Sequence, residues 1–281
     1  MYRGIPGEVA PVYRVTKCLE GCVAVAVKSC FEDEDKYIHY FQDAIGVPVL
    51  SVGPLVSAVQ PVTDGSEGSD LLEWLDRQRP SSVVFVSFGS ETFLSRDQAR
   101  ELAIGLEESG FPFLWSLRDP QFLDDYRELL PDGFENRTRD RGLVVQGWVP
   151  QVRILSHPSV GGFLSHGGWS SAMEALSYGL PLILLPRRLE QGLNARQITT
   201  ELKAGLEVER GDDGSFSRES ICKAVKMVMA GEEGKSMRSK AVEAGDIVVA
   251  NIGRQQSYIH DFIQHLEQFK EANYLGKNAV K

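Results

Sequence analysis

The 281-residue sequence lacks several features that would place it in a specialised class of protein. No apolar run approaches the roughly 18 residues that a transmembrane helix needs, and the N-terminus carries no signal-peptide pattern. Basic residues are in the minority, since 30 Lys and Arg face 39 Asp and Glu, and the net charge is −9. This acidic balance argues against nucleic acid or an anionic membrane as a partner.

Cysteine is scarce, and the sequence shows neither an internal repeat nor a low-complexity block. The four cysteines are Cys18, Cys22, Cys30 and Cys222. The Cys18–Cys22 spacing is wrong for a zinc pair, and no histidine or cluster of carboxylates suggests another metal site. We therefore expect reduced thiols, a cytoplasmic location, no metal and no resident cofactor.

What is present is a soluble globular composition, 42% apolar and 25% charged, long enough for one or two domains. Short apolar runs alternate with helical patterns, and six strands fit between Val83 and Val208. Such alternation predicts an α/β fold, a Rossmann-like parallel sheet with helices on both faces and right-handed crossovers. Five of these runs have clear bounds, at residues 82–88, 111–117, 143–147, 160–164 and 182–185.

Helices are predicted between and after these strands. A capping box of Ser95 and Gln98 starts one helix, which Gly110 ends. The others are expected at about 70–78, 218–229, 235–250 and 255–269. Before them, residues 22–27 and 47–52 read as strands around a helix at 31–41, and the Gly-, Pro- and Ser-rich stretch 53–69 is typical of a linker.

The stretch from Trp148 to Gln191 carries residues that packing alone does not require. Its centre predicts strand, turn and helix: an apolar run, then His166-Gly167-Gly168, then a helix from about Ser170. Glycines let a ligand approach the backbone closely, and a helix N-terminus attracts anions, most often phosphate. His166 stands where an open α/β sheet places its ligands and can donate to a phosphate oxygen.

Simpler interpretations exist for each of these residues. Glu174 stands three residues after Ser171, which is capping-box spacing. His166 could end a strand without binding anything, and Trp148 and Trp169 could belong to the core. Ser90, at the end of an earlier strand, is either a second phosphate donor or a serine of an ordinary turn. Taken together, however, the residues of this stretch favour a nucleotide-sugar site.

This stretch, from WVPQ through SHGGWSSAMEAL to LEQ, resembles the signature box of plant family 1 UDP-dependent glycosyltransferases, which have the two-domain GT-B fold. The segments DGSFSRES, EEGKSMRSKA and SYIHDFIQHL are similar to the branch that glycosylates glycosides. The resemblance implies that Trp148 stacks on uracil, that the Val149 backbone pairs with its edge, and that Gln151 and Glu174 hold the ribose. It further implies a set of residues around the diphosphate and the sugar, namely Ser90, His166, Gly168, Ser170, Ser171, Trp169, Glu190 and Gln191.

Two positions depart from the family pattern. Ser170 stands where the family has Asn, and Glu190 stands where it has Asp, so the carboxylate lies one methylene further out. Gln191 is the family's glucose-type residue, and the expected donor is UDP-glucose, with rhamnose left open. The implied partners are a UDP-sugar and a small plant metabolite or its glycoside as acceptor.

The resemblance also assigns the parts of the chain. Residues 1–52 correspond to a fragment of the N-terminal acceptor-binding domain, 53–69 to a linker, 70–250 to the UDP-sugar-binding domain, and 251–281 to a helix and tail that dock on the N-terminal domain. The catalytic His and Asp that the family uses for inverting, metal-independent transfer have no match here. No catalytic residue is therefore assigned, and the missing half of the enzyme is an expected partner.

Other functions remain open from the sequence alone. The chain could be a UDP-sugar-binding module with no activity of its own. A nucleotide-sugar epimerase would interconvert the free donor without an acceptor. A phosphorylase would need a lysine for pyridoxal phosphate, and none stands beside the glycine-rich turn.

Overall fold

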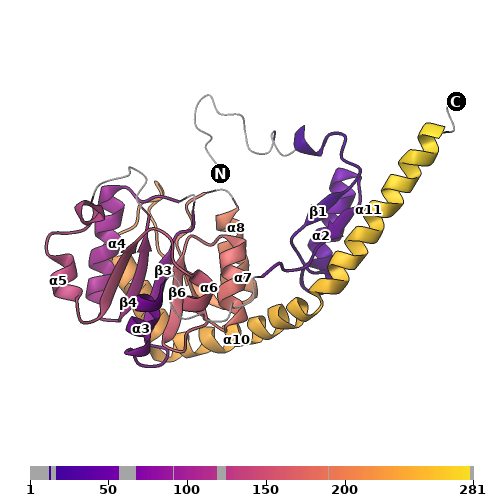
Figure 1. The fold of residues 1–281 in the computed structure, drawn as a ribbon. Coiled ribbons are helices and arrows are strands. Elements are labelled where there is room, and N and C mark those ends of the chain that lie inside the picture. Colours follow the sequence, from indigo (N-terminus) through magenta and orange to yellow (C-terminus); the bar gives the residue numbers. More distant parts are fainter. Residues whose placement is uncertain are drawn as a thin grey trace. The chain divides into compact units, whose positions relative to one another are not determined.

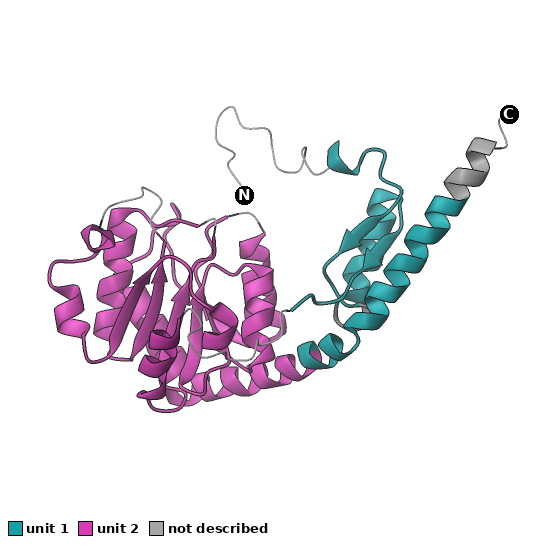
Figure 2. Ribbon diagram, in the orientation of Figure 1, with its two compact units in different colours: residues 1–56, 248–281 teal, residues 57–247 magenta. Residues whose placement is uncertain are grey.

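The computed structural model describes residues 13, 17–56, 68–90, 92–118, 125–188 and 190–278. The chain divides into two compact units, one of residues 1–56 with 248–281 and one of residues 57–247 (Figure 2). The predicted linker falls largely, at residues 57–67, outside the described residues, as do the first twelve residues and the last three.

The smaller unit is built on two short parallel strands. Strand β1 (Val25–Val27) pairs with β2 (Val49–Ser51), and helix α2 (Phe31–Ile45) connects them. Helix α11 (Gln255–Asn278) contacts β2, and Gln255 at its start donates to Val52 O at 2.7 Å and accepts from Leu55 N at 3.0 Å. The smaller unit therefore contains segments from both ends of the chain.

The larger unit contains the predicted six-stranded sheet (Figure 1). Its strands are β3 (Val83–Ser87), β4 (Phe113–Leu117), β5 (Gly142–Gln146), β6 (Val160–Ser165), β7 (Leu182–Leu184) and β8 (Gly205–Glu207). All neighbouring pairs are parallel, in the order β5-β4-β3-β6-β7-β8. Numbered from β3, this is the order 3-2-1-4-5-6 of a doubly wound dinucleotide-binding sheet, so the predicted fold class is confirmed.

Helices cover both faces of this sheet (Figure 1). Helices α4 (Arg96–Ser109) and α9 (Arg218–Met229) pack against each other, and a Cβ at Gly105 would lie 2.6 Å from Ile221 Cβ. The capping box of Ser95 and Gln98 that the sequence predicts at the start of α4 is present, and Gly110 ends the helix at φ 78°. The remaining helices are α3 (Ser69–Asp76), α5 (Phe134–Thr138), α6 (Gln151–Leu155), α7 (Trp169–Ser177), α8 (Gln191–Arg196), a π-helical turn (Gln197–Glu201) and α10 (Gly231–Gly253).

The core is made of strand and helix side chains that the apolar runs of the sequence supply. Phe85 and Phe163, from adjacent strands, stack with ring centroids 5.2 Å apart, and Phe113 stacks on Phe134 at 5.8 Å. All four side chains are buried, and full burial of a large apolar side chain contributes about 1.5–3 kcal/mol each. This rigid sheet holds its strand ends in place for a site.

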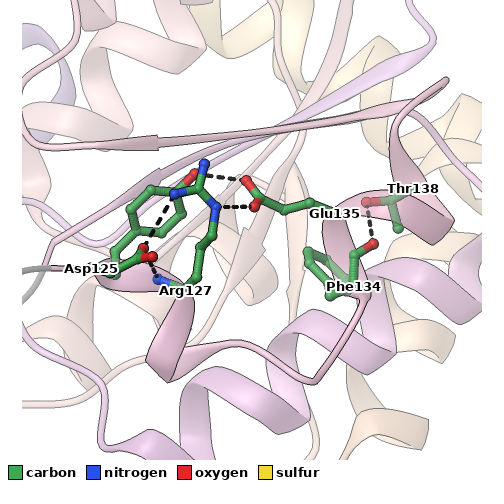
Figure 3. Close-up of polar contacts among 6 residues, drawn as sticks. Asp125, Arg127, Phe134, Glu135 and Thr138 are labelled. Atoms are coloured by element: carbon green, nitrogen blue, oxygen red, sulfur yellow. Dashed lines mark hydrogen bonds and ion pairs between the residues drawn. The ribbon is translucent and has the colours of Figure 1, made fainter.

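A polar cluster holds the connection from β4 to β5 (Figure 3). The 3₁₀ helix Tyr126–Leu129 begins at Asp125, whose carboxylate accepts from Arg127 N at 2.9 Å. Glu135 accepts from both the Tyr126 hydroxyl and Arg127 Nε at 2.6 Å. Burial and the Glu135 hydrogen bond raise the pKa of Tyr126 to about 12, so this hydroxyl remains a donor at neutral pH.

Candidate UDP-sugar site

The site begins where the strand order of the larger sheet reverses, between β3 and β6. The two strands lie side by side with Ser87 opposite Ser165. Beyond these serines the chain continues as Gly89-Ser90 on one side and as His166-Gly167-Gly168 on the other. Open α/β sheets bind ligands outside the carboxyl ends of the strands at such a point.

The His166 ring lies between two glycines, one from each strand end. A Cβ at Gly168 would lie 2.5 Å from His166 Nε2, and a Cβ at Gly89 would lie 2.9 Å from His166 Cε1. Gly89 also has φ +72°, a conformation that other residues rarely adopt. The glycines therefore provide the space in which the imidazole edge sits, and Gly89 is a site residue that the sequence analysis missed.

The turn after β6 is fixed by side chains on both sides. Gly167 has φ +81°, its N–H donates to Ser165 Oγ at 3.3 Å, and its carbonyl accepts from Asn194 Nδ2 at 2.9 Å. Helix α7 follows with Gly168 as its N-cap and no side-chain cap. The first N–H groups of a helix have no partner within the helix, so this end offers hydrogen bonds and a positive dipole to an anion.

The residues predicted to hold the ribose are brought together. The Gln151 amide nitrogen, at the start of α6, donates to Glu174 Oε2 at 2.8 Å and to Ser171 Oγ at 3.1 Å. Because α7 begins at Trp169 with Gly168 as N-cap, Ser171 is not a capping residue, and the interpretation of Glu174 as a capping-box acid is wrong. Glu174 instead reaches across from α7 to α6.

The two tryptophans of the signature stretch have different environments. Trp148, between β5 and α6, is 62% exposed, so its assignment to the core is wrong. An indole presented in this way is available for stacking on a base. Its neighbour Val149 is buried and anchors the loop, while Trp169, at the first position of α7, is half-buried.

The remaining predicted residues lie beyond the carboxyl ends of β3, β6 and β7. Ser90 is exposed beyond β3, and Ser170 is exposed in the first turn of α7. Beyond β7, Glu190 is exposed and precedes α8, while Gln191 is buried and its Oε1 accepts from Arg187 N at 2.9 Å and Arg188 N at 3.0 Å. All twelve predicted residues belong to the larger unit.

The other histidines offer no comparable arrangement in the described ranges. His157 contacts Asp76 at 3.1 Å and Ser159 Oγ at 2.8 Å, which ties α3 to the start of β6. His39 pairs with Asp35 on the exposed face of α2. No group of three or more His, Cys, Asp or Glu in the described parts could hold a metal ion, and none of the helices described there is long and apolar enough to cross a membrane.

A reversed strand order, a histidine at the switch point and a helix start without a side-chain cap form the arrangement that nucleotide-binding α/β domains use. The comparison with protein families is more specific. Residues 45–242 match the model of the UDP-glucoronosyl and UDP-glucosyl transferase family, and the chain belongs to this family. The family and the fold that the resemblance implied are confirmed.

The chain is similar to plant proteins that act on small molecules. A cyanidin-3-O-glucoside 2-O-glucuronosyltransferase from Bellis perennis is 40% identical over 273 residues, which are 96% of this chain and 60% of that protein. The structure of a transferase from Siraitia grosvenorii in complex with UDP has a TM-score of 0.76 at 34% identity, over 89% of this chain and 58% of the other. That of Phytolacca americana UGT2 with UDP-2fluoro-glucose and pterostilbene has a TM-score of 0.68 at 40% identity, over 80% and 48%. The chain thus spans about half the length of these relatives.

Proposed function

We propose that this chain forms the donor site of an inverting, metal-independent glycosyltransferase. The enzyme would transfer glucose from UDP-glucose to a hydroxyl of a small plant metabolite or its glycoside, with rhamnose as the alternative donor sugar. The observation that carries the proposal is the bonded set of Gln151, Ser171 and Glu174 next to the uncapped start of α7. It is supported by the solved relatives that hold UDP and UDP-2fluoro-glucose.

In this proposal each part of the site has a chemical task. Trp148 stacks on uracil with its exposed indole, and Val149 presents the backbone to the base edge. Glu174 accepts from ribose hydroxyls, because a carboxylate can serve two adjacent hydroxyls. His166, with Ser90, Ser170, Ser171 and the helix start, stabilises the charge that grows on the departing diphosphate.

The sugar lies at the ends of β6 and β7 in this proposal, where Trp169, Glu190 and Gln191 would face its hydroxyls. The base that removes the acceptor's proton is proposed to lie outside this chain, in the N-terminal half of the enzyme. This chain would then bind the donor and turn over little. The four free cysteines favour a reducing compartment, and we propose the cytoplasm, which imaging of a fluorescent fusion would test.

Isothermal titration calorimetry tests the donor site directly. The chain should bind UDP and UDP-glucose, and should bind GDP-mannose and ADP-glucose at least about tenfold more weakly, because a purine does not match a site built for the uracil edge. Equal binding of all three nucleotide sugars would contradict the proposal.

A second experiment tests for sugar transfer. The N-terminal half of the Bellis perennis relative is added in trans, and transfer from UDP-glucose or UDP-rhamnose to cyanidin-3-O-glucoside is followed by chromatography. Transfer supports the glycosyltransferase, and the preferred donor decides between glucose and rhamnose. If the chain binds the donor but no transfer occurs with the added N-terminal half, a binding module without activity of its own would be favoured.

A further inference from the structure

Three buried serines form one row across three adjacent strands of the larger sheet, β4, β3 and β6 (Figure 1). Ser87 on β3 lies in register with Ser116 on β4 and with Ser165 on β6. The row is apolar again on the strands to either side, at Val145 on β5 and Leu184 on β7. The hydroxyls are therefore confined to the strands around the point where the strand order reverses.

The row is polar although its surroundings in the sheet are apolar. Two residues earlier on the same strands, and on the same face, stand Leu114, Phe85 and Phe163, all fully buried. The opposite face of these strands packs on helices α4 and α9 in the main apolar core. A buried hydroxyl costs free energy unless it forms a hydrogen bond, so packing alone favours apolar residues at the three positions. The partners of the hydroxyls therefore indicate the role of the row.

Ser116 holds the loop that presents Trp148. Its hydroxyl donates to Gly147 O at 3.1 Å, across 31 residues of sequence. Gly147 has φ +94° and donates its own N–H to Leu117 O at 3.2 Å, so the chain leaves β5 in a turn that is fixed against the end of β4. The next residue is Trp148, whose exposed indole is proposed to stack on uracil.

Ser165 holds the turn that carries His166. Its hydroxyl oxygen accepts from Gly167 N at 3.3 Å and lies 3.4 Å from His166 Nδ1. Ser165 is fully buried, and a buried hydroxyl needs an acceptor for its proton. His166 Nδ1 is within reach of that proton, and accepting it leaves the proton of a neutral imidazole on Nε2, the ring nitrogen beside Gly168.

We propose that Ser116 and Ser165 are positioning residues for uridine diphosphate, each acting on a different part of it. Ser116 acts on the base through Trp148, and Ser165 acts on the phosphates through the tautomer and orientation of His166. Ser87 stands between them in the row, so the loop before Trp148 and the turn after β6 are anchored at adjacent positions of one rigid sheet. The inference rests on the proposed function and extends it from the residues that would touch the ligand to the layer beneath them.

The chain offers a matched control for each serine. Ser109, the last residue of α4, is buried and donates to a backbone carbonyl at 2.7 Å, which matches Ser116. Ser159, just before β6, is buried with its hydroxyl 2.8 Å from His157 Nδ1, which matches Ser165. Neither control lies at a carboxyl end of the sheet, so its substitution removes a buried hydrogen bond away from the proposed site.

Titration of alanine variants with uridine and with UDP, by NMR and calorimetry, separates effects on the base from effects on the phosphates. Ser116→Ala should weaken uridine and UDP by the same factor, about three- to tenfold, the net contribution of one hydrogen bond. Ser165→Ala should weaken UDP by about tenfold and leave uridine within about twofold. Ser109→Ala and Ser159→Ala should lower the melting temperature and leave both ligands within about twofold, because distant sites do not couple.

Heteronuclear NMR of the chain labelled at its histidine nitrogens gives a second readout, which a merely structural role of the serine would not change. His166→Ala identifies the signals of His166. With the imidazole neutral, wild-type His166 should carry its proton on Nε2 only, whereas Ser165→Ala should show both tautomers.

The inference and the proposed function fail separately. A folded Ser116→Ala or Ser165→Ala chain in which uridine and UDP change in any other proportion overturns the inference and leaves the proposed function standing. The same holds if a control variant reproduces either pattern, or if wild-type His166 carries its proton on Nδ1. A cooperatively folded wild-type chain that binds neither uridine nor UDP overturns both. Where the fully buried Ser165 does not tolerate alanine and the variant fails to fold, Ser116→Ala and its control decide alone.

Discussion

Substitutions of three glycines test whether the imidazole at the strand switch point binds the diphosphate. Gly168→Ala places a methyl group 2.5 Å from His166 Nε2, a distance that only displacement of the ring relieves. The Gly168 backbone, at φ −62° and ψ 129°, accommodates alanine. The expected loss of stability is about 1 kcal/mol, because alanine is a poorer N-cap than glycine.

The loss of affinity should be larger than the loss of stability suggests. A hydrogen bond to a charged group contributes about 1.5–3 kcal/mol, so displacement of His166 should weaken UDP binding by roughly 10- to 150-fold. Gly89→Ala adds backbone strain to the same clash, because Gly89 has φ +72° and the new Cβ would lie 2.9 Å from His166 Cε1. It should lose about 1–2 kcal/mol of stability from the left-handed conformation and bind UDP as poorly as Gly168→Ala.

Gly110→Ala is the control variant, because it introduces the backbone strain of a positive φ without a clash with the His166 ring. Gly110 has φ +78° and no atom within 4 Å of a built Cβ, so this variant should lose about 1–2 kcal/mol of stability and retain wild-type affinity. Calorimetric titration with UDP and thermal unfolding measure the two quantities. In the His166→Ala background, Gly168→Ala should have little further effect on affinity, since the ring it displaces is gone. Wild-type UDP affinity in Gly168→Ala, or a full further loss in the double variant, would refute the role of the imidazole.

Three further outcomes are expected. Trp148→Ala should weaken UDP binding by about 1–3 kcal/mol in calorimetry while the melting temperature changes little, because the indole is 62% exposed; unchanged affinity would exclude stacking. Glu174→Gln should reduce affinity for UDP more than for free pyrophosphate, since it would act on the ribose; an equal reduction for both ligands would contradict that role. Glu101→Gln should lower the melting temperature at pH 7, because the hydrogen bond from Arg218 holds the pKa of Glu101 below its ordinary value of 4.5. Because the depressed pKa of Glu101 stabilises the folded chain above pH 4.5, the difference from wild type should shrink as the pH falls below 4.5 and should vanish only below the lower folded-state pKa. A difference that does not shrink there would point to another cause.

The regular elements of the larger unit were predictable because their signals are local. The capping box of Ser95 and Gln98, the apolar strand runs and Arg218–Met229 depend on neighbours within a few residues, and the structure has them where the sequence indicates. Short elements were missed, among them α5, α6 and the 3₁₀ helix Tyr126–Leu129. Their few residues carry no resolved period.

The positions at which strands and helices begin and end depend on tertiary contacts, which the sequence does not show. The strand predicted at 22–27 is reduced to Val25–Val27, since the preceding residues turn at Gly21 with φ +80°. The last helix extends to Asn278 instead of ending near residue 269. Helices shift their ends in this way because packing outweighs weak propensity at the termini.

The sequence predicted which residues form the candidate site, but it did not predict the hydrogen bonds and contacts between them. The resemblance supplied Gln151 and Glu174 as partners of one ribose, but their hydrogen bond spans 23 residues and depends on how α6 meets α7. The position of His166 between Gly89 and Gly168 depends on the pairing of β3 with β6. Only the three-dimensional arrangement shows that Arg187 and Gln98 are neighbours.

The hydrogen bonds of Gln191 also give the proposed sugar contact a direction. Its carbonyl oxygen is already occupied by two main-chain N–H groups, so only its amino group remains to meet a ligand. A hydroxyl bound there must act as the acceptor, and its own proton must point elsewhere, toward a group such as the Glu190 carboxylate. The Gln191 amide would thus donate a hydrogen bond to a sugar hydroxyl, and the same hydroxyl would donate to the Glu190 carboxylate. Exchanging the two residue types between positions 190 and 191 would reverse the direction of both hydrogen bonds.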